Sequence, residues 1–147
     1  MRIFAAVLVS AFALLVAPAL AETDTFNATA TLTLGGTDAQ GRLIASGPIT
    51  SPGFGKGTLS YAITIGSNGT TSGPLVAKFK FGTLKGTTSG TLTADPAGGN
   101  ALAGKGRLTG GTRAYKDAKG IFKYTGHDHA DGTDTLALKG KVTFPTR

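Results

Sequence analysis

Residues 104 to 126, GKGRLTGGTRAYKDAKGIFKYTG, decide the fold that the sequence predicts, because they place two strands around a short apolar turn. Thr112 is suited to cap a helical turn, and Gly120 supplies the flexible backbone at which extended chain resumes. The apolar residues between them are spaced to share one face of the turn: Ala114, Tyr115 and Ala118. We therefore predict one short helical turn near residues 112–118, which covers an open end of an all-β fold.

The rest of the chain predicts strands joined by short turns. From Phe26 to Leu34, apolar residues alternate with Asn and Thr, which is the pattern of a strand with one buried face. Further strands are bounded by Gly, Pro or Asn-Gly turns, and lie near residues 42–46, 59–65, 75–81, 84–94, 101–109, 120–126 and 135–144. Eight strands with short connections predict an eight-stranded antiparallel barrel, because closing the sheet removes both exposed edges.

Glycines recur on the predicted inner face of this barrel, where they alternate with Leu and Val: Gly86, Gly90, Gly104, Gly106 and Gly140. Two interpretations remain open. Aromatic side chains fill the vacated space, namely Phe79, Phe81, Phe122 and Phe144, or the glycines leave an apolar pocket. Tyr61, Thr88 and Tyr124 are the only polar groups expected to point inward. No inward carboxylate, His or Lys is expected, so the interior has no evident general acid or base.

The first 21 residues differ from all the others. Arg2 precedes an apolar run that reaches Ala17, and Pro18 then leads to the Ala19-Leu20-Ala21 exit, as in a cleaved secretory signal peptide. The alternative is an uncleaved membrane anchor, because the apolar run is just long enough to span a bilayer. We predict a signal peptide at residues 1–21, a single β-barrel domain at residues 22–147, and a secreted or periplasmic location.

Composition limits the chemistry of the mature chain. It has no cysteine, which excludes disulfides and thiol catalysis, and Glu22 is its only glutamate. Loss of Arg2 with the signal peptide leaves 14 Lys and Arg against 8 Asp and Glu, a net charge of +6. Many of the cations are expected to point outward and form a basic belt: Lys78, Lys80, Lys85, Lys105, Arg107, Lys123, Lys139 and Lys141.

The basic belt has two interpretations. It protects strands from aggregation, or it binds an anionic partner in the cell envelope, such as lipid headgroups or an anionic polysaccharide. Nucleic acid is not expected as a partner, because no aromatic residues alternate with these cations and the chain is predicted to be exported.

Both histidines lie in the segment His127-Asp128-His129, which Asp131 and Asp134 follow. His127 and His129 could share a metal ion with Asp131 or Asp134 as a third ligand. The alternative is a polar hairpin turn at Asp131-Gly132, which attracts the same residue types. We therefore predict no metal site and no cofactor, and keep His127, His129 and Asp131 only as weak candidates for metal ligands.

The central segment resembles the glycine-rich motif of the allene oxide cyclase-like and dirigent-like barrels, close to G-x-G-x-x-x-G-G-T-G-x-[YF]-x-x-A-x-G. The residues that match are Gly104, Gly106, Gly110, Gly111, Thr112, Tyr115, Ala118 and Gly120. Arg113 stands where the family usually has glycine. Upstream FGKGTLSYAIT and downstream TLALKGKVTF look like other strands of bacterial members.

The resemblance implies a barrel that encloses a cavity. Members of this family steer a fatty-acid epoxide or orient phenoxy radicals there. For this chain we predict a non-enzymatic protein that binds a small apolar ligand, with six residues at the site: Tyr61, Phe79, Phe81, Thr88, Phe122 and Tyr124. Two alternatives stay open: a cyclase or isomerase that acts by confinement, and an envelope interaction module that uses the basic belt.

Overall fold

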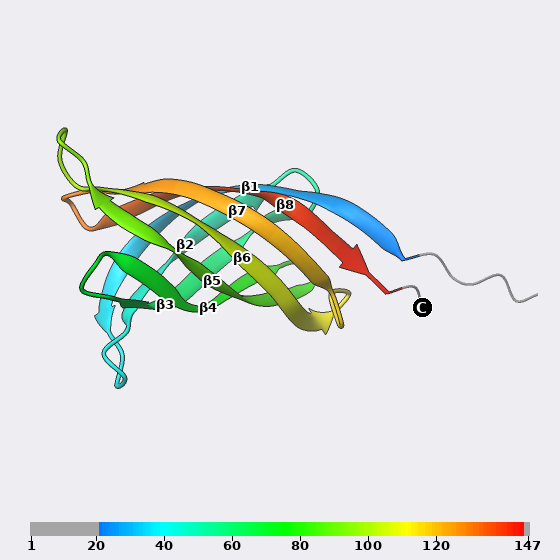
Figure 1. Cartoon of the computed structure of the whole chain (residues 1–147). Coiled ribbons are helices and arrows are strands. Elements are labelled where there is room, and N and C mark those ends of the chain that lie inside the picture. Colours follow the sequence, from blue (N-terminus) through cyan, green and yellow to red (C-terminus); the bar gives the residue numbers. More distant parts are fainter. Residues whose placement is uncertain (1–20, 146–147) are drawn as a thin grey trace, which may run out of the picture.

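The computed structural model describes residues 21–145 and confirms the eight-stranded antiparallel barrel. Each strand pairs with its neighbours in the sequence, and β8 pairs with β1 to close the sheet (Figure 1). The strands are β1 (Glu22–Thr37), β2 (Leu43–Ser51), β3 (Gly55–Ile65), β4 (Thr70–Phe79), β5 (Gly82–Ala94), β6 (Asn100–Arg113), β7 (Lys119–Asp128) and β8 (Thr133–Phe144). Residues 1–20 of the predicted signal peptide lie outside the described part of the chain.

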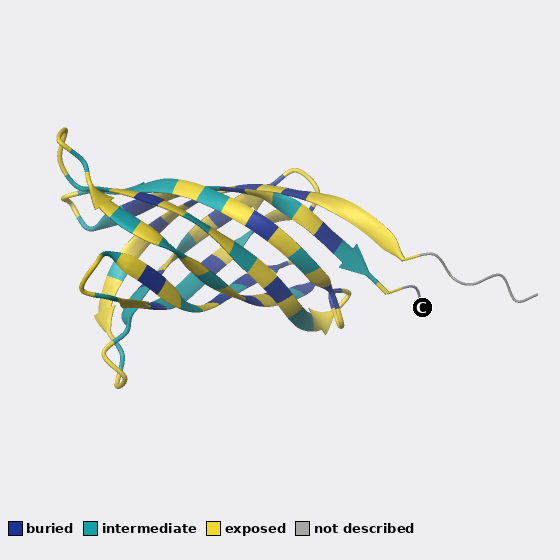
Figure 2. Cartoon of the chain, in the orientation of Figure 1, coloured by how far each residue is buried: buried dark blue, intermediate teal, exposed yellow. Residues whose placement is uncertain are grey.

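Burial alternates along the strands as the sequence predicts. On β1, Phe26, Ala28, Ala30 and Leu32 are buried, and the residues between them are exposed (Figure 2). Each strand therefore contributes alternate side chains to a core inside the barrel. No helix long and apolar enough to cross a membrane occurs between residues 21 and 145.

The prediction of a helical turn near residues 112–118 is wrong. β6 continues to Arg113, and residues 114–117 form a tight turn that leads into β7. Thr112 does not cap a helix, because its backbone pairs with Thr83 and its Oγ1 accepts a hydrogen bond from the Thr83 amide at 3.2 Å. Arg113 and Asp117 have φ angles of 55° and 61°, which are left-handed and incompatible with a right-handed helical turn. Strand pairing, which the local sequence pattern does not report, extends the hairpin instead.

The same turn nevertheless covers one end of the barrel. Tyr115 and Ala118 are buried, and the Tyr115 ring packs against Phe54 from the β2–β3 turn, with their centroids 5.4 Å apart. Phe54 also contacts the rings of Phe26 and Phe79, at 5.4 and 5.5 Å. Aromatic side chains thus close this end, which lies to the right in Figure 1.

Inner-face glycines are matched by large side chains on the neighbouring strands. Gly106 pairs with Phe122, and a Cβ at Gly106 would overlap the Phe122 ring. Gly104 pairs with Tyr124, and a Cβ there would collide with its phenol group. Phe122 and Tyr124 therefore occupy the space that the glycines vacate, which favours the filled interior over the open pocket along these strands.

Candidate functional site

The barrel interior retains a small cavity of about 40 Å³, which is lined by side chains from β3 to β8. Four of the six predicted ligand-binding residues line it: Tyr61, Thr88, Phe122 and Tyr124. Such a space accommodates a few water molecules, whereas pockets for small-molecule ligands typically measure about 300 to 1,000 Å³. The described conformation therefore leaves no room for an apolar ligand of ordinary size.

The other two predicted ligand-binding residues lie elsewhere. Phe79 packs in the aromatic cluster at the closed end, with its ring centroid 6.4 Å from that of Tyr115. Phe81 was expected to point inward, and this is wrong: it is 60% exposed in the β4–β5 turn, where Lys80 Nζ lies 5.4 Å from its ring centroid. The turn between β4 and β5 interrupts the alternation that placed Phe81 in phase with Phe79.

The expectation of an interior without carboxylates is also wrong. Asp134, near the start of β8, is 2% exposed, and Tyr61 of β3 donates a hydrogen bond from its hydroxyl to Asp134 Oδ2. The Asp134 Oδ1 atom has no hydrogen-bond partner among the described residues. A sequence signal for this position did exist, because Asp134 has the same parity as the inward-facing Leu136 and Leu138.

A second carboxylate lies beside Asp134 on the neighbouring strand. Asp128 of β7 pairs with Asp134, and its Oδ2 accepts a hydrogen bond from Asn100 Nδ2 at 2.9 Å. Burial raises the pKa of Asp134, and the nearby Asp128 raises it further, against the lowering effect of the Tyr61 hydroxyl. Burial and the bond to Asp134 also raise the pKa of Tyr61. The pair is therefore neutral over a wider pH range than exposed groups of the same types.

The two histidines flank Asp128 in the sequence, and their rings lie 4.6 Å apart between centroids, tilted by 42°. His127 Nε2 lies 3.1 Å from Asp95 Oδ2, and His129 Nε2 lies 3.2 Å from Thr135 Oγ1. Asp131 accepts hydrogen bonds from the amide and hydroxyl of Thr133, so it organises the β7–β8 turn. Among residues 21–145, no group of three or more His, Cys, Asp or Glu is arranged to hold a metal ion.

The outer surface of β5 to β8 carries a different arrangement. Backbone pairing aligns Lys105, Lys123 and Lys139 in one row across β6, β7 and β8. A second row, two residues along the strands, consists of Arg107, Ile121 and Lys141. All six side chains are exposed, and Ile121 is 66% exposed. Thr87 and Ser89 of β5 extend the two rows, opposite Arg107 and Lys105.

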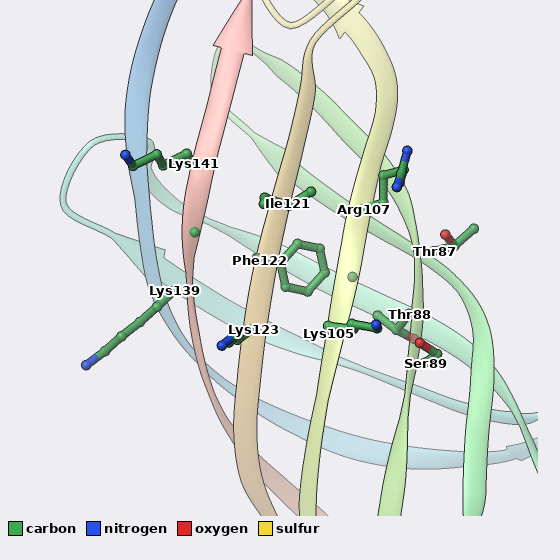
Figure 3. Close-up of a pocket in the computed structure, with 12 residues that line it drawn as sticks. Thr87, Thr88, Ser89, Lys105, Arg107, Ile121, Phe122, Lys123, Lys139 and Lys141 are labelled. Carbon is green, nitrogen blue, oxygen red and sulfur yellow. The ribbon is translucent and has the colours of Figure 1, made fainter.

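A hollow of about 690 Å³ lies along these rows, and we call it the basic trough. Its cationic lining consists of Lys105, Arg107, Lys123, Lys139 and Lys141, and Thr87, Ser89 and Ile121 complete the outward-facing walls. Its floor follows the row between the walls, where Gly106 and Gly140 flank Phe122 (Figure 3). The two glycines present no side chains outward or inward, so the backbone itself forms much of the floor.

No carboxylate balances the cations of the trough. The ion pairs among the described residues join Arg42 to Asp38 and His127 to Asp95, both away from the trough. Lys105, Lys123 and Lys139 stand directly opposite one another, an arrangement that is destabilising by itself. The remaining belt residues, Lys78, Lys80 and Lys85, are exposed on β4, the β4–β5 turn and β5, outside the trough.

The molecule thus presents two candidate sites: the interior cavity with its buried Tyr61–Asp134 pair, and the basic trough. Comparison of the chain with protein-family models, with curated proteins and with solved structures yields no match, so its two sites rest on their own geometry.

Proposed function

We propose that the chain is a secreted or periplasmic binding module without catalytic activity, and that the basic trough holds an anionic partner of the cell envelope. One observation carries the proposal: five cations surround a hollow of about 690 Å³ that contains no carboxylate. Clefts with charge of a single sign concentrate ligands of the opposite sign. The volume falls within the range of ligand-binding pockets.

The placement of the cations supports binding over a purely solubilising role. Cations that only keep a protein soluble work best when they are dispersed and mixed with carboxylates. Here Lys105, Lys123 and Lys139 face one another across adjacent strands, where their mutual repulsion opposes folding. An anion in the trough removes that repulsion and gains attraction to several cations at once.

Retention on a carboxylate-bearing matrix and on phosphatidylglycerol vesicles at low salt tests the proposal. The variant Lys105→Glu/Lys141→Glu should be released at a lower salt concentration than the parent. A control with the same change in net charge, Lys56→Glu/Lys78→Glu, alters exposed residues outside the trough and should be released later than the trough variant. Equal release of the two variants would mean that net charge alone governs retention, and the proposal would be discarded.

A second candidate is a small apolar ligand inside an allene oxide cyclase-like or dirigent-like barrel, with confinement-type isomerase chemistry as its enzymatic form. Two observations favour it. The interior cavity is lined by Tyr61, Tyr124 and mostly apolar side chains. Arg113, which stands at a family glycine, has a φ angle of 55°, a conformation that glycine adopts without strain. Binding at this site requires the interior to expand.

An apolar fluorescent probe tests this second candidate. Because a side chain at Gly104 would collide with Tyr124, Gly104→Leu should destabilise the barrel by about 1 to 3 kcal/mol. If the interior does expand, the parent should bind the probe, and Leu136→Phe, which adds volume at the cavity wall, should weaken that binding. A parent that binds no probe under conditions where it is fully folded would remove the candidate.

A further inference from the structure

The dimensions and lining of the basic trough favour one class of anion over others. This inference rests on the proposed function, that the trough binds an anion. From β5 to β8 the trough crosses three gaps between strands, so it is about 14 Å long. Its two walls stand two residues apart along the strands, which separates them by about 7 Å. These dimensions describe a narrow trough that runs across the strands and is lined by cations on both sides.

The trough excludes some anionic partners on geometric grounds. A bilayer presents a broad surface, whereas the exposed cations here stand in two short rows on either side of a narrow floor, where all of them can contact one narrow ligand. Bases of a single-stranded nucleic acid stack on exposed aromatic side chains. The trough offers none, because its one aromatic residue, Phe122, is 3% exposed and points into the core.

The lining matches a sugar polymer in three respects. Lys105, Lys123 and Lys139 repeat at about the spacing of neighbouring strands, close to 4.8 Å, so they can pair with acidic groups carried on successive units of one chain. Thr87 and Ser89 provide hydroxyl groups for hydrogen bonds at the β5 end. Ile121 provides an exposed apolar contact for the C–H groups of a sugar ring.

We infer that the basic trough binds a single chain of a linear acidic polysaccharide, laid across β5 to β8 with its carboxylate or sulfate groups between the two rows of cations. The polysaccharide chain runs perpendicular to the strand axes, along the direction of the hydrogen bonds between strands, and it lies over the backbone floor formed at Gly106 and Gly140. Several weak charge pairs then act together on one ligand, so affinity depends on ligand length.

Fluorescently labelled polygalacturonate is the probe for this inference, at low salt and with the protein shown to be folded by circular dichroism. Short oligomers of galacturonate should bind at least roughly tenfold more tightly than the monomer, and affinity per site should level off once the oligomer fills the trough. Neutral dextran should not compete. Phosphatidylglycerol vesicles and a thymidine oligonucleotide should compete much less well than unlabelled polygalacturonate at equal charge concentration.

Three variants locate the binding site. Lys123→Gln/Lys139→Gln should weaken polygalacturonate binding by roughly tenfold, and the matched control Lys56→Gln/Lys78→Gln by roughly twofold or less. Ile121→Ser leaves the charge unchanged and should weaken polygalacturonate binding by roughly threefold without altering retention on the carboxylate matrix.

The outcomes separate this inference from the proposed function. If vesicles or the oligonucleotide bind as tightly as polygalacturonate, or if the monomer binds as tightly as the oligomers, the polysaccharide assignment is overturned and the anion-binding trough remains. If the trough variant and its control lose affinity equally, polygalacturonate does not occupy the trough. If the parent binds no polyanion, both the inference and the proposed function fall.

Discussion

The two ends of the barrel differ in the side chains that they carry: aromatic rings gather at one end and carboxylates at the other. At one end, turns from β2–β3 and β6–β7 bring Phe54 and Tyr115 together over the core. At the other end lie five of the eight carboxylates: Asp38, Asp95, Asp128, Asp131 and Asp134. Arg42 is the only Lys or Arg in the four turns of that acidic end.

The two openings of this barrel, which has no disulfides, are closed by different interactions, so the stability of each end depends on different physical factors. The aromatic end excludes water by packing, so its stability depends on shape and area and is insensitive to pH. The acidic end buries a polar pair, Tyr61 and Asp134, beside a second carboxylate. Its stability depends on protonation, because burial penalises the charged form of Asp134. Mutations at the two ends should therefore respond differently to pH.

The largest effect is expected at the aromatic end. Phe54→Ala removes a ring that contacts Phe26, Phe79, Tyr115 and Phe144, and should lower the free energy of unfolding by about 3 to 5 kcal/mol. Urea denaturation at several pH values measures it. The loss should be the same from pH 5 to pH 8, and Phe81→Ala, at a ring 60% exposed, should change little. A small loss for Phe54→Ala would mean that this turn does not close the barrel.

The next largest loss of stability is expected at Gly111, close to the β6–β7 turn that carries Tyr115. A Cβ at Gly111 would collide with the carbonyl oxygens of Thr83 and Tyr115, whereas a Cβ at Gly110 meets no atom within 4 Å. Gly111→Val should therefore destabilise the protein by about 1 to 3 kcal/mol, and Gly110→Val should be tolerated. Thermal unfolding of the two variants makes the comparison. Similar melting temperatures would show that the close approach at Gly111 relaxes easily.

At the acidic end, Tyr61→Phe should have a smaller effect. The substitution removes the hydroxyl that bonds to Asp134 Oδ2, and should lower the free energy of unfolding by about 1 kcal/mol. Loss of this hydroxyl also raises the pKa of Asp134, since the Tyr61 bond lowers it. Tyr124→Phe serves as the control, because no hydrogen bond from the Tyr124 hydroxyl occurs within the described residues. Equal effects of the two variants would exclude a specific role for the Tyr61–Asp134 bond.

Asp134→Asn should change the free energy of unfolding least at acidic pH, and the difference from the parent should grow as pH rises. The pKa of Asp134 is raised in the folded protein, so its contribution to stability is full below its ordinary pKa of about 3.9 and is lost as pH rises through the raised value. Asn has no such proton to lose and can still accept the Tyr61 hydrogen bond. Relative to the parent, the variant should become more stable as pH increases from 4 to 8.

Denaturation curves of Asp134→Asn and parent at matched pH values test this expectation. A stability difference that stays constant from pH 4 to pH 8 would show that Asp134 titrates as an exposed carboxyl does. The two barrel ends would then not differ in how their stability depends on pH.

Much of the fold could be predicted from local pattern, and the exceptions have specific causes. The alternation of Phe26 to Leu34 with Asn and Thr identified β1 and the side that it buries. The turn at Arg113 was predicted as helical, because apolar spacing over a few residues looks the same in a helical turn and in a hairpin loop that folds onto a core. The exposed Phe81 was placed inside because alternation was carried past the end of β4.

The candidate sites were predicted less completely. Outward orientation of Lys105, Arg107, Lys123, Lys139 and Lys141 follows from strand periodicity, and all five are exposed. Their alignment into two rows depends on the register between strands, which periodicity within one strand does not contain. Asp134 was considered only as an alternative third metal ligand beside the polar turn at Asp131-Gly132, whereas its partner Tyr61 is 73 residues away in the sequence.

By itself, the sequence determined which residues form strands, which side of each strand is apolar and how much positive charge the chain carries, because these depend on residue type and on a period of two along one strand. Only the tertiary structure decided that Phe122 and Tyr124 fill the space beside Gly106 and Gly104, that Tyr61 meets Asp134, and that five cations border one trough. Each of these features joins residues on different strands. Their meeting is fixed by register and barrel closure, which arise from the packing of all eight strands together.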